Sequence, residues 1–434
     1  MLKRLRNILL RFGTAPGRKR LLHGAFFRTW RLSFKIAAAY RRCVVRTTRI
    51  VVVVGSFGKT TTTRVIHSAL DLPGRIPRGW NSGGFLAAEL LRIRPGQRYG
   101  VLEVGISCKK TMVRCARFIK PDIVVVTSIG SEHHQSLGTL EATRHEKADM
   151  VRALPLSGLA VLNGDDPNVR WMGELTRARV LTFGFGESCD VRASAITLDI
   201  RTGMCFSLHA NGKVFEMSSR LVGRHQLYSF LAAITVVVGE NLPLVGALQR
   251  LQRITPAPGR LEVMALKNNA FLLLDSFKSI QETIATSLDT LAELQADRKI
   301  VVMGDIEEPF GPQGPLYSDL GARIARIAER VVFVGGEKAF KRLVQGVRAS
   351  GMPRENVIYA GHSPKRAADI VQEDLHAGDL ALIKGRSTQQ LERVAFLLAG
   401  YPVPCDIAVC ELKTGCADCP LTKHLRLNEI HNGR

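Results

Sequence analysis

Short apolar runs rich in valine alternate along this chain with longer segments whose apolar residues recur at helical spacing. The runs "VVVV" at 51–54, "GVLEVG" at 100–105 and "AFLLLD" at 270–275 have the length and composition of buried strands. Strands that alternate with helices build mainly parallel sheets covered by helices. The pattern therefore predicts an α/β fold throughout the body of the protein.

A glycine-rich loop follows the first of these strands and reads "GSFGKTTT". Its glycines let backbone N–H groups turn toward an anion, and the helix predicted from Thr60 presents its positive end. Lys59 would reach the outer phosphates of a nucleotide, and the Thr60 hydroxyl would bind Mg²⁺. A plain strand–turn–helix is the alternative, but the order of strand, loop, Lys-Thr pair and helix favours phosphate binding. The residues predicted to hold the phosphates are Gly55, Ser56, Gly58, Lys59, Thr60 and Thr61.

Charge is concentrated at the start of the chain. The 434 residues carry a net charge of +23, but residues 1–50 hold fourteen Lys or Arg and no Asp or Glu, which leaves +9 for the remainder. Apolar runs in this segment are too short and too often broken by Arg to span a bilayer or to form a cleaved signal. Residues 1–45 are predicted to form a basic aromatic arm that contacts an anionic membrane surface. Packing on the protein itself is the main alternative, and nucleic acid is the least favoured partner because the charge is confined to the arm.

Composition otherwise describes an ordinary globular protein. Hydrophobic residues make up 46% of the chain and charged residues 23%, which excludes wholesale disorder. The nine cysteines do not form a disulfide framework, and the nucleotide loop implies a reducing cytoplasm.

The loop spacing resembles that of the Mur ligases, the ATP-dependent amide-forming enzymes of peptidoglycan synthesis and their relatives. Further segments resemble the family in the correct order and extend the resemblance over about residues 50 to 400. They are "NSGGF", "YGVLEVGIS", "KPDIVVVTSIGSEHHQSLGTLEATRHEKADMV", "AVLNGDDPNV", "GRHQLYSFLAAITVV", "PAPGRLE", "LLLDSFKSIQETIATSLDTL", "KIVVMGDIEE" and "GDLALIKGRSTQQLERV".

The resemblance implies further site residues. Glu103 and Thr60 would bind one Mg²⁺, and His133 would bind a second. Lys147 would carry a CO₂-derived carbamate, which turns a cation into an anion suited to metals. With Lys59, the residues Glu103, His133 and Lys147 would form the catalytic set. Nucleotide contacts are expected from Asn163, Gln226, Arg260 and Asp275.

The implied reaction joins a carboxylate to an amine at the expense of ATP. The carboxylate attacks the γ-phosphate to give an acyl phosphate, which the amine then attacks, so catalysis rests on positioning and on cancelling negative charge. The expected substrates are an acidic small-molecule, polymeric or lipid-linked carboxylate and an amino acid or dipeptide. The alternative is a nucleotide-binding membrane or assembly protein whose ligase chemistry has degenerated.

Several positions depart from the family pattern. Ser128 and Ser229 stand where the family has Asn, Gln226 replaces another Asn, and "DSFKSIQ" lacks the Asn and Pro of the family motif. The phosphate loop follows only about fifty residues, whereas muramyl ligases carry a UDP-sugar-binding domain of roughly a hundred residues before it. We therefore expect that domain to be lacking.

A group of cysteines lies near the end of the chain. Cys416 and Cys419 have the spacing of a metal knuckle, and Cys410 lies close enough in sequence to join them. Cys405 or His424 could complete a Zn²⁺ site, and the four cysteines could instead hold an iron–sulfur cluster. Free thiols are the alternative. The predicted organisation is thus an arm at 1–45, a P-loop central domain at 46–255, a Rossmann-like C-terminal domain at 256–402 and a cysteine-rich tail at 403–434.

Overall fold

The computed structural model describes residues 30–74, 83–106, 109–130, 139–309, 311–410, 415–416 and 419. The chain divides into two compact units. The first contains the described residues up to Ser194 together with Ser207–Met217 and Leu227–Gln252. The second contains Ala195–Phe206, Ser218–Gln226 and the described residues from Arg253 onward.

An eight-stranded sheet organises the first unit, with strand order β2-β1-β3-β4-β5-β6-β7-β8. The pairs from β2 through β6 are parallel, so the carboxyl ends of β1, β2, β3 and β4 meet at one edge. In that register Val53 pairs with Glu103, and Val54 pairs with Val126. The strands are β1 (Arg49–Val54), β2 (Tyr99–Glu103), β3 (Ile123–Val126), β4 (Leu159–Asn163), β5 (Arg179–Gly184), β6 (Val191–Asp199), β7 (Gly203–Ala210) and β8 (Lys213–Ser219).

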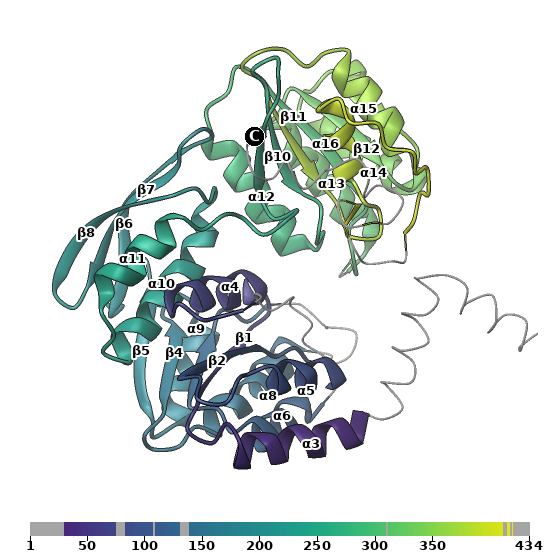
Figure 1. The fold of residues 1–434 in the computed structure, drawn as a ribbon. Coiled ribbons are helices and arrows are strands. Elements are labelled where there is room, and N and C mark those ends of the chain that lie inside the picture. Colours follow the sequence, from purple (N-terminus) through teal and green to yellow (C-terminus); the bar gives the residue numbers. More distant parts are fainter. Residues whose placement is uncertain are drawn as a thin grey trace, which may run out of the picture. The chain divides into compact units, whose positions relative to one another are not determined.

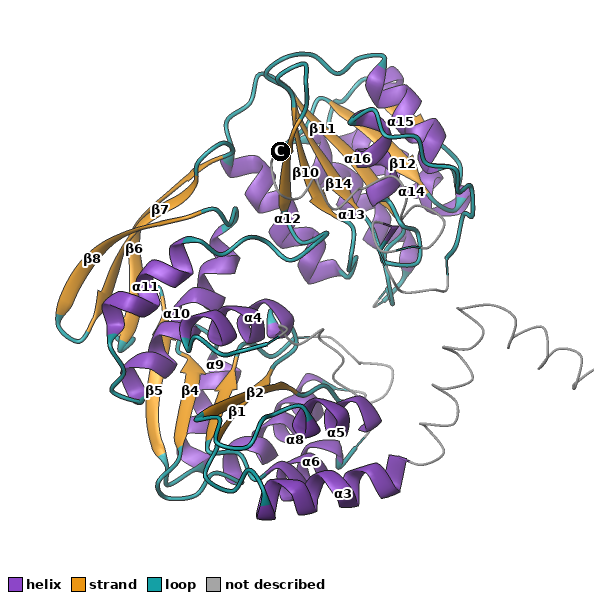
Figure 2. Ribbon diagram, viewed as in Figure 1, coloured by secondary structure: helices purple, strands orange, loops and turns teal. Residues whose placement is uncertain are grey.

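Helices cover the sheet on both faces (Figure 1). In Figure 2, α5, α6 and α8 lie on one face with α3 packed against α5 and α6, and α4, α10 and α11 lie on the other. The valines of β1 are fully buried between these layers, which explains why the run "VVVV" contains no polar residue. The helices are α3 (Trp30–Cys43), α4 (Lys59–Ala69), α5 (Gly83–Leu91), α6 (Thr111–Ile119), α8 (Leu140–Arg152), α9 (Pro167–Arg170), the 3₁₀ helix η1 (Trp171–Leu175), α10 (Arg224–Gly239) and α11 (Leu244–Gln252).

The second unit is built on a six-stranded sheet of order β13-β12-β11-β14-β10-β9. Its pairs are parallel except for β9 with β10 at one edge, and two apolar clusters fill the space on its two faces. Both units thus confirm the predicted α/β fold with mainly parallel sheets. The elements are β9 (Glu262–Ala265), β10 (Phe271–Asp275), α12 (Gln281–Glu293), β11 (Lys299–Gly304), α13 (Gln313–Ala325), β12 (Arg330–Val334), α14 (Glu337–Ala349), the 3₁₀ helix η2 (Arg354–Asn356), β13 (Val357–Tyr359), α15 (Pro364–Gln372), β14 (Leu380–Lys384) and α16 (Glu392–Leu398).

One buried arginine fastens α3 to the rest of the first unit. Arg41 is 6% exposed, and its guanidinium donates to the Asp122 carboxylate at 2.9 Å and to the Ile119 carbonyl at 3.0 Å. It also donates to the carbonyl of Val45 at 2.7 Å. The described part of the basic N-terminal segment therefore packs on the protein through α3. Within the described residues, no helix is both long and apolar enough to cross a bilayer.

Replacing Arg41 with Ala should destabilise the first unit by about 3 kcal/mol, because the change leaves Asp122 and buried carbonyls without their donor. Urea unfolding followed by circular dichroism measures the effect. Arg46→Ala, at an exposed position just beyond α3, is the matched control and should change stability by less than about 0.5 kcal/mol. A loss below about 1 kcal/mol in the Arg41 variant would contradict this role.

Candidate phosphate-binding site

The glycine-rich loop passes so close to β3 that only glycine fits at its start. Gly55 has φ of +149°, and a Cβ there would lie 1.9 Å from Oγ1 of Thr127. Gly58 has φ of +77° in the left-handed region and caps the N-terminus of α4, which begins at Lys59, one residue earlier than predicted. These two positions set the path of the loop, and the N-terminal N–H groups of α4 follow it.

Lys59 is held against the loop. Its side chain is buried, and its ammonium donates to the carbonyl oxygens of Gly55 at 2.9 Å and Ser56 at 3.0 Å. Its position places a fixed positive charge where the helix also presents its positive end.

Thr60 and Glu103 meet at the carboxyl edge of the sheet. The Thr60 hydroxyl donates to Oε2 of Glu103 at 2.9 Å, and Glu103 is only 5% exposed at the end of β2. A buried carboxylate is costly unless it is paired or binds a cation. Thr61, in the first turn of the same helix, is half-buried.

Lys147 reaches the same loop from α8. It is 1% exposed, and its Nζ donates to Oγ of Ser56 at 2.7 Å. The same serine oxygen accepts from the backbone N–H of Gly130 at 2.8 Å. Lys59, Thr60, Glu103 and Lys147 are therefore gathered around one loop, whereas His133 lies outside the described residues.

Asn163 and Ser128 support the loop from the neighbouring strand ends. The Asn163 amide donates to the Thr127 carbonyl at 2.9 Å, and its oxygen accepts from the N–H of Asp165 at 3.0 Å. Ser128, where the family has Asn, accepts from the N–H of Phe57 at 3.1 Å. Its carbonyl accepts from the N–H of Ser56 at 2.7 Å. The shorter serine thus still bonds to the loop backbone.

In the second unit, Asp275 is paired with a buried lysine that the sequence interpretation missed. Lys384, at the end of β14, is 1% exposed and donates to Oδ2 of Asp275 at 2.6 Å. The Ser287 hydroxyl donates to the same oxygen at 2.5 Å. Burial lowers the pKa of Lys384, and the Asp275 carboxylate opposes that shift. A lysine that ends the apolar run "LALIK" was the available signal.

Arg260 and Gln226 lie near each other in this unit. The Arg260 guanidinium carbon is 4.5 Å from the centroid of the Phe277 ring. Gln226 is buried and donates to the carbonyl oxygens of Val222 at 3.0 Å and Arg260 at 3.5 Å. Beside it, burial lowers the pKa of His225 to about 4.

The described residues contain no cluster of three or more His, Cys, Asp or Glu placed to hold a metal ion. The Thr60 hydroxyl and the Glu103 carboxylate nevertheless form a pair of hard oxygen donors that suits Mg²⁺. In the tail, Cys416 and Cys419 are buried, and Cys405 and Cys410 are half-buried. Burial raises the pKa of the Cys416 thiol.

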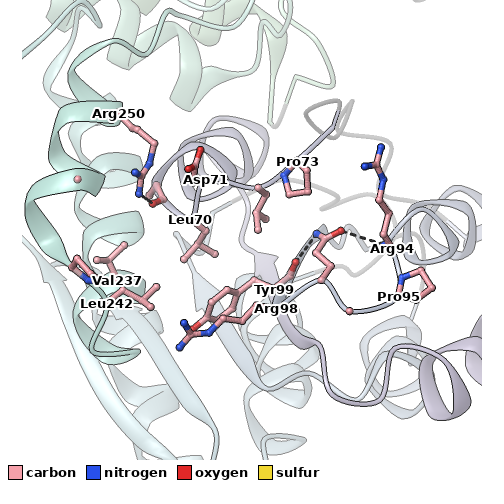
Figure 3. Close-up of a pocket in the computed structure, with 16 residues that line it drawn as sticks. Leu70, Asp71, Pro73, Arg94, Pro95, Arg98, Tyr99, Val237, Leu242 and Arg250 are labelled. Atoms are coloured by element: carbon pink, nitrogen blue, oxygen red, sulfur yellow. Dashed lines mark hydrogen bonds between the residues drawn. The ribbon is translucent and has the colours of Figure 1, made fainter.

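A pocket of about 560 Å³ lies at the other end of the strands (Figure 3). It is lined by the end of α4, including Leu70 and Asp71, and by Tyr99 at the start of β2. Arg250 closes one side and donates to the Ala69 carbonyl at 2.7 Å. Because α4 begins at the phosphate loop and ends at this pocket, the pocket is separate from the phosphate site.

Comparison with known proteins gives consistent matches. The model of the Mur ligase middle domain matches residues 53–237, and that of the Mur ligase glutamate ligase domain matches residues 259–387. The UDP-N-acetylmuramoyl-tripeptide–D-alanyl-D-alanine ligase of Mycobacterium tuberculosis strain H37Rv is 27% identical over 375 residues, which cover 80% of this chain and 72% of that protein. The enzyme of the same name from Bacillus subtilis is 24% identical over 361 residues, which cover 82% of this chain and 77% of that protein.

Solved structures share the fold. MurF from Acinetobacter baumannii superposes with a TM-score of 0.74 at 20% identity, covering 86% of this chain and 81% of that one. MurF ligase from Thermotoga maritima, solved in complex with ADP, superposes with a TM-score of 0.74 at 21% identity. The superposition covers 86% of this chain and 84% of that one. Together with the two domain models, which span most of the sequence in the expected order, these matches establish that the chain belongs to the Mur ligase family and is an ATP-dependent ligase that forms amide bonds.

Proposed function

We propose that this ligase activates the carboxylate of a cell-wall peptide as an acyl phosphate and joins it to a dipeptide such as D-alanyl-D-alanine. The observation that carries the proposal is the convergence of Lys59, the Thr60–Glu103 pair and Lys147 on one phosphate loop. The dipeptide is inferred from the names of the relatives in Mycobacterium tuberculosis and Bacillus subtilis.

The first step needs positive charge because a carboxylate must approach an already anionic triphosphate. Lys59 would bind the outer phosphate oxygens, and the N–H groups at the start of α4 would hold the phosphates in line for attack. A carboxylate oxygen then forms a bond to the γ-phosphorus as the bond to ADP breaks. The amine attacks the acyl carbon, and inorganic phosphate leaves from the tetrahedral intermediate.

Thr60 and Glu103 would hold Mg²⁺, which supplies charge neutralisation at the phosphates when bound. His133 is proposed to serve a second Mg²⁺. Lys147 would act as a carbamate, and its burial beside the Ser56 hydroxyl supports this role, since that hydroxyl can donate to a carbamate oxygen.

We assign nucleotide contacts to Asn163, Gln226, Arg260 and Asp275. Both bonds that Asp275 accepts from Lys384 and Ser287 use Oδ2, so Oδ1 is the oxygen that would accept from ribose hydroxyls. Arg260, stacked on Phe277, would contact phosphate or adenine. Lys384 fixes the position of the Asp275 carboxylate.

The carrier of the carboxylate is proposed to be either a nucleotide-linked or a lipid-linked muramoyl peptide at the cytoplasmic side of the membrane. The basic segment at residues 1–50 favours the lipid-linked form, because cations attract the protein to the surface where such a substrate lies. Zn²⁺ or an iron–sulfur cluster at the tail cysteines remains part of the proposal, and metal analysis of the purified protein tests it.

Acceptor-dependent ADP formation tests the proposed substrates. With ATP, Mg²⁺ and a muramoyl-peptide carboxylate, adding D-alanyl-D-alanine should stimulate ADP release far more than adding D-alanine or L-alanine, because only the correct amine traps the acyl phosphate. Nucleotide-linked and lipid-linked carriers are compared side by side. Nucleotide binding without stimulation by any amino acid or dipeptide would instead identify a degenerate ligase.

Replacing Glu103 with Gln should raise the Mg²⁺ concentration needed for half-maximal turnover by roughly 10- to 100-fold. The amide oxygen can still accept from Thr60, so the fold is retained while the negative charge is lost. Titration of Mg²⁺ against ADP formation measures the shift, and EDTA should abolish turnover in both proteins.

Glu187→Gln, at an exposed position of the same unit, is the matched control and should leave the Mg²⁺ requirement of the enzyme unchanged. If the Glu103→Gln and Glu187→Gln variants need the same Mg²⁺ concentration for half-maximal turnover, Glu103 does not bind Mg²⁺.

A further inference from the structure

The outer face of α3 carries apolar side chains that the fold leaves exposed. Leu32 is 59% exposed and Ile36 is 51% exposed, and the small side chains of Ala39 and Cys43 are exposed as well. Positions 32, 36, 39 and 43 recur at the alternating spacing of four and three that puts side chains in one stripe along a helix. The stripe is continuous along α3 and needs an explanation, because the inner face alone would suffice to attach the helix.

Other sides of the same helix pack on the protein. The ring centroid of Phe34 lies 4.6 Å from that of Phe118 on α6, and the Tyr40 hydroxyl donates to the Ile93 carbonyl at 2.6 Å. Arg41 anchors the end of the helix through Asp122. These contacts fix the rotation of α3, and Figure 1 shows the helix at the edge of its unit with α5 and α6 to one side. The stripe therefore points away from the protein.

Cations border the stripe. Lys35 and Arg42 are exposed on α3, two turns apart along one flank, and the exposed Arg46 follows the helix. The surrounding sequence has the same sign, since residues 1–50 contain fourteen basic and no acidic residues. An apolar stripe flanked by Lys and Arg is the pattern of helices that lie in the plane of a membrane surface.

We propose that this face of α3, made of Leu32, Lys35, Ile36, Ala39 and Arg42, docks on an anionic lipid bilayer. The apolar side chains would enter the boundary between headgroups and acyl chains, and the cations would pair with anionic headgroups. A second copy of the chain would bring cations against cations, and a nucleic acid would leave the apolar side chains without a partner. An anionic bilayer offers a partner both to the apolar stripe and to the cations beside it. This inference rests on the proposed function only in that docking would bring the ligase to a lipid-linked carboxylate.

Vesicle co-sedimentation of the full-length chain tests the proposal. Wild-type protein should sediment with vesicles of phosphatidylcholine and phosphatidylglycerol but not with phosphatidylcholine alone. The double variant Leu32→Glu/Ile36→Glu should bind at least about 10-fold more weakly, because two carboxylates would face an anionic surface. The control Leu156→Glu/Val245→Glu changes side chains that are 75% and 62% exposed elsewhere on the same unit, and it should bind like wild type.

A second variant separates charge from apolar contact. Lys35→Glu/Arg42→Glu should also bind more weakly, and its remaining binding should depend less on salt concentration than that of wild type. Equal sedimentation of all variants would overturn the proposal. So would a wild-type dimer that Leu32→Glu/Ile36→Glu dissociates without any vesicle binding, which would identify a second copy as the occupant.

ADP formation with a soluble carboxylate substrate and D-alanyl-D-alanine distinguishes the proposed ligase reaction from the proposed docking by α3. The turnover of every α3 variant should match wild type, because the altered side chains lie outside the phosphate site. Loss of vesicle binding with full turnover supports docking by α3 alone. If no protein turns over but wild type and control still dock, the proposed substrates are wrong and the docking surface stands.

Discussion

The repulsion between a carboxylate and the terminal phosphate of ATP is the constraint that shapes this protein. Both groups are anions, and they must come within bonding distance before any amide can form. In the first unit, Lys59, the positive end of α4 and the Thr60–Glu103 pair, which suits Mg²⁺, lie around one loop and would offset this repulsion. Lys147 reaches the same loop, where we propose that it carries a carbamate. The loop can pass among them because Gly55 has no side chain to strike Thr127.

The parallel sheet makes that arrangement possible. Lys59 follows β1 after the glycine-rich loop, Glu103 ends β2 and Asn163 ends β4, so residues far apart in sequence share one edge of the sheet. Apolar strands that end in a polar residue therefore predicted which side chains lie at this edge, and the valine-rich runs themselves predicted the α/β architecture. The role proposed for Lys147 needed the family resemblance, because "ATRHEKADMV" alone resembles any solvated helix.

Other features could not be read from local sequence because they depend on long-range pairing. Lys384 pairs with Asp275, which lies more than a hundred residues earlier, and the segment "LALIK" alone does not predict that partner. Arg41 is one of fourteen basic residues in its segment, and only packing distinguishes it as the buried one. The same segment then contributes both an inner face that packs and an outer face of exposed apolar and cationic side chains, for which we propose docking on a bilayer. Composition alone does not separate these two faces, so the sequence predicted a single basic arm.

The chemistry and the proposed docking surface can be separated experimentally, since one depends on the loop and the other on α3. The acyl phosphate is the intermediate on which the chemistry depends, and it transfers an oxygen atom from the carboxylate to inorganic phosphate. When both oxygens of the carboxylate substrate carry ¹⁸O and the reaction runs with ATP and the dipeptide, an acyl phosphate requires one labelled oxygen to leave in each inorganic phosphate released. Mass spectrometry of the phosphate should find that single label at every turnover. Amide formation with unlabelled phosphate would show that no acyl phosphate forms.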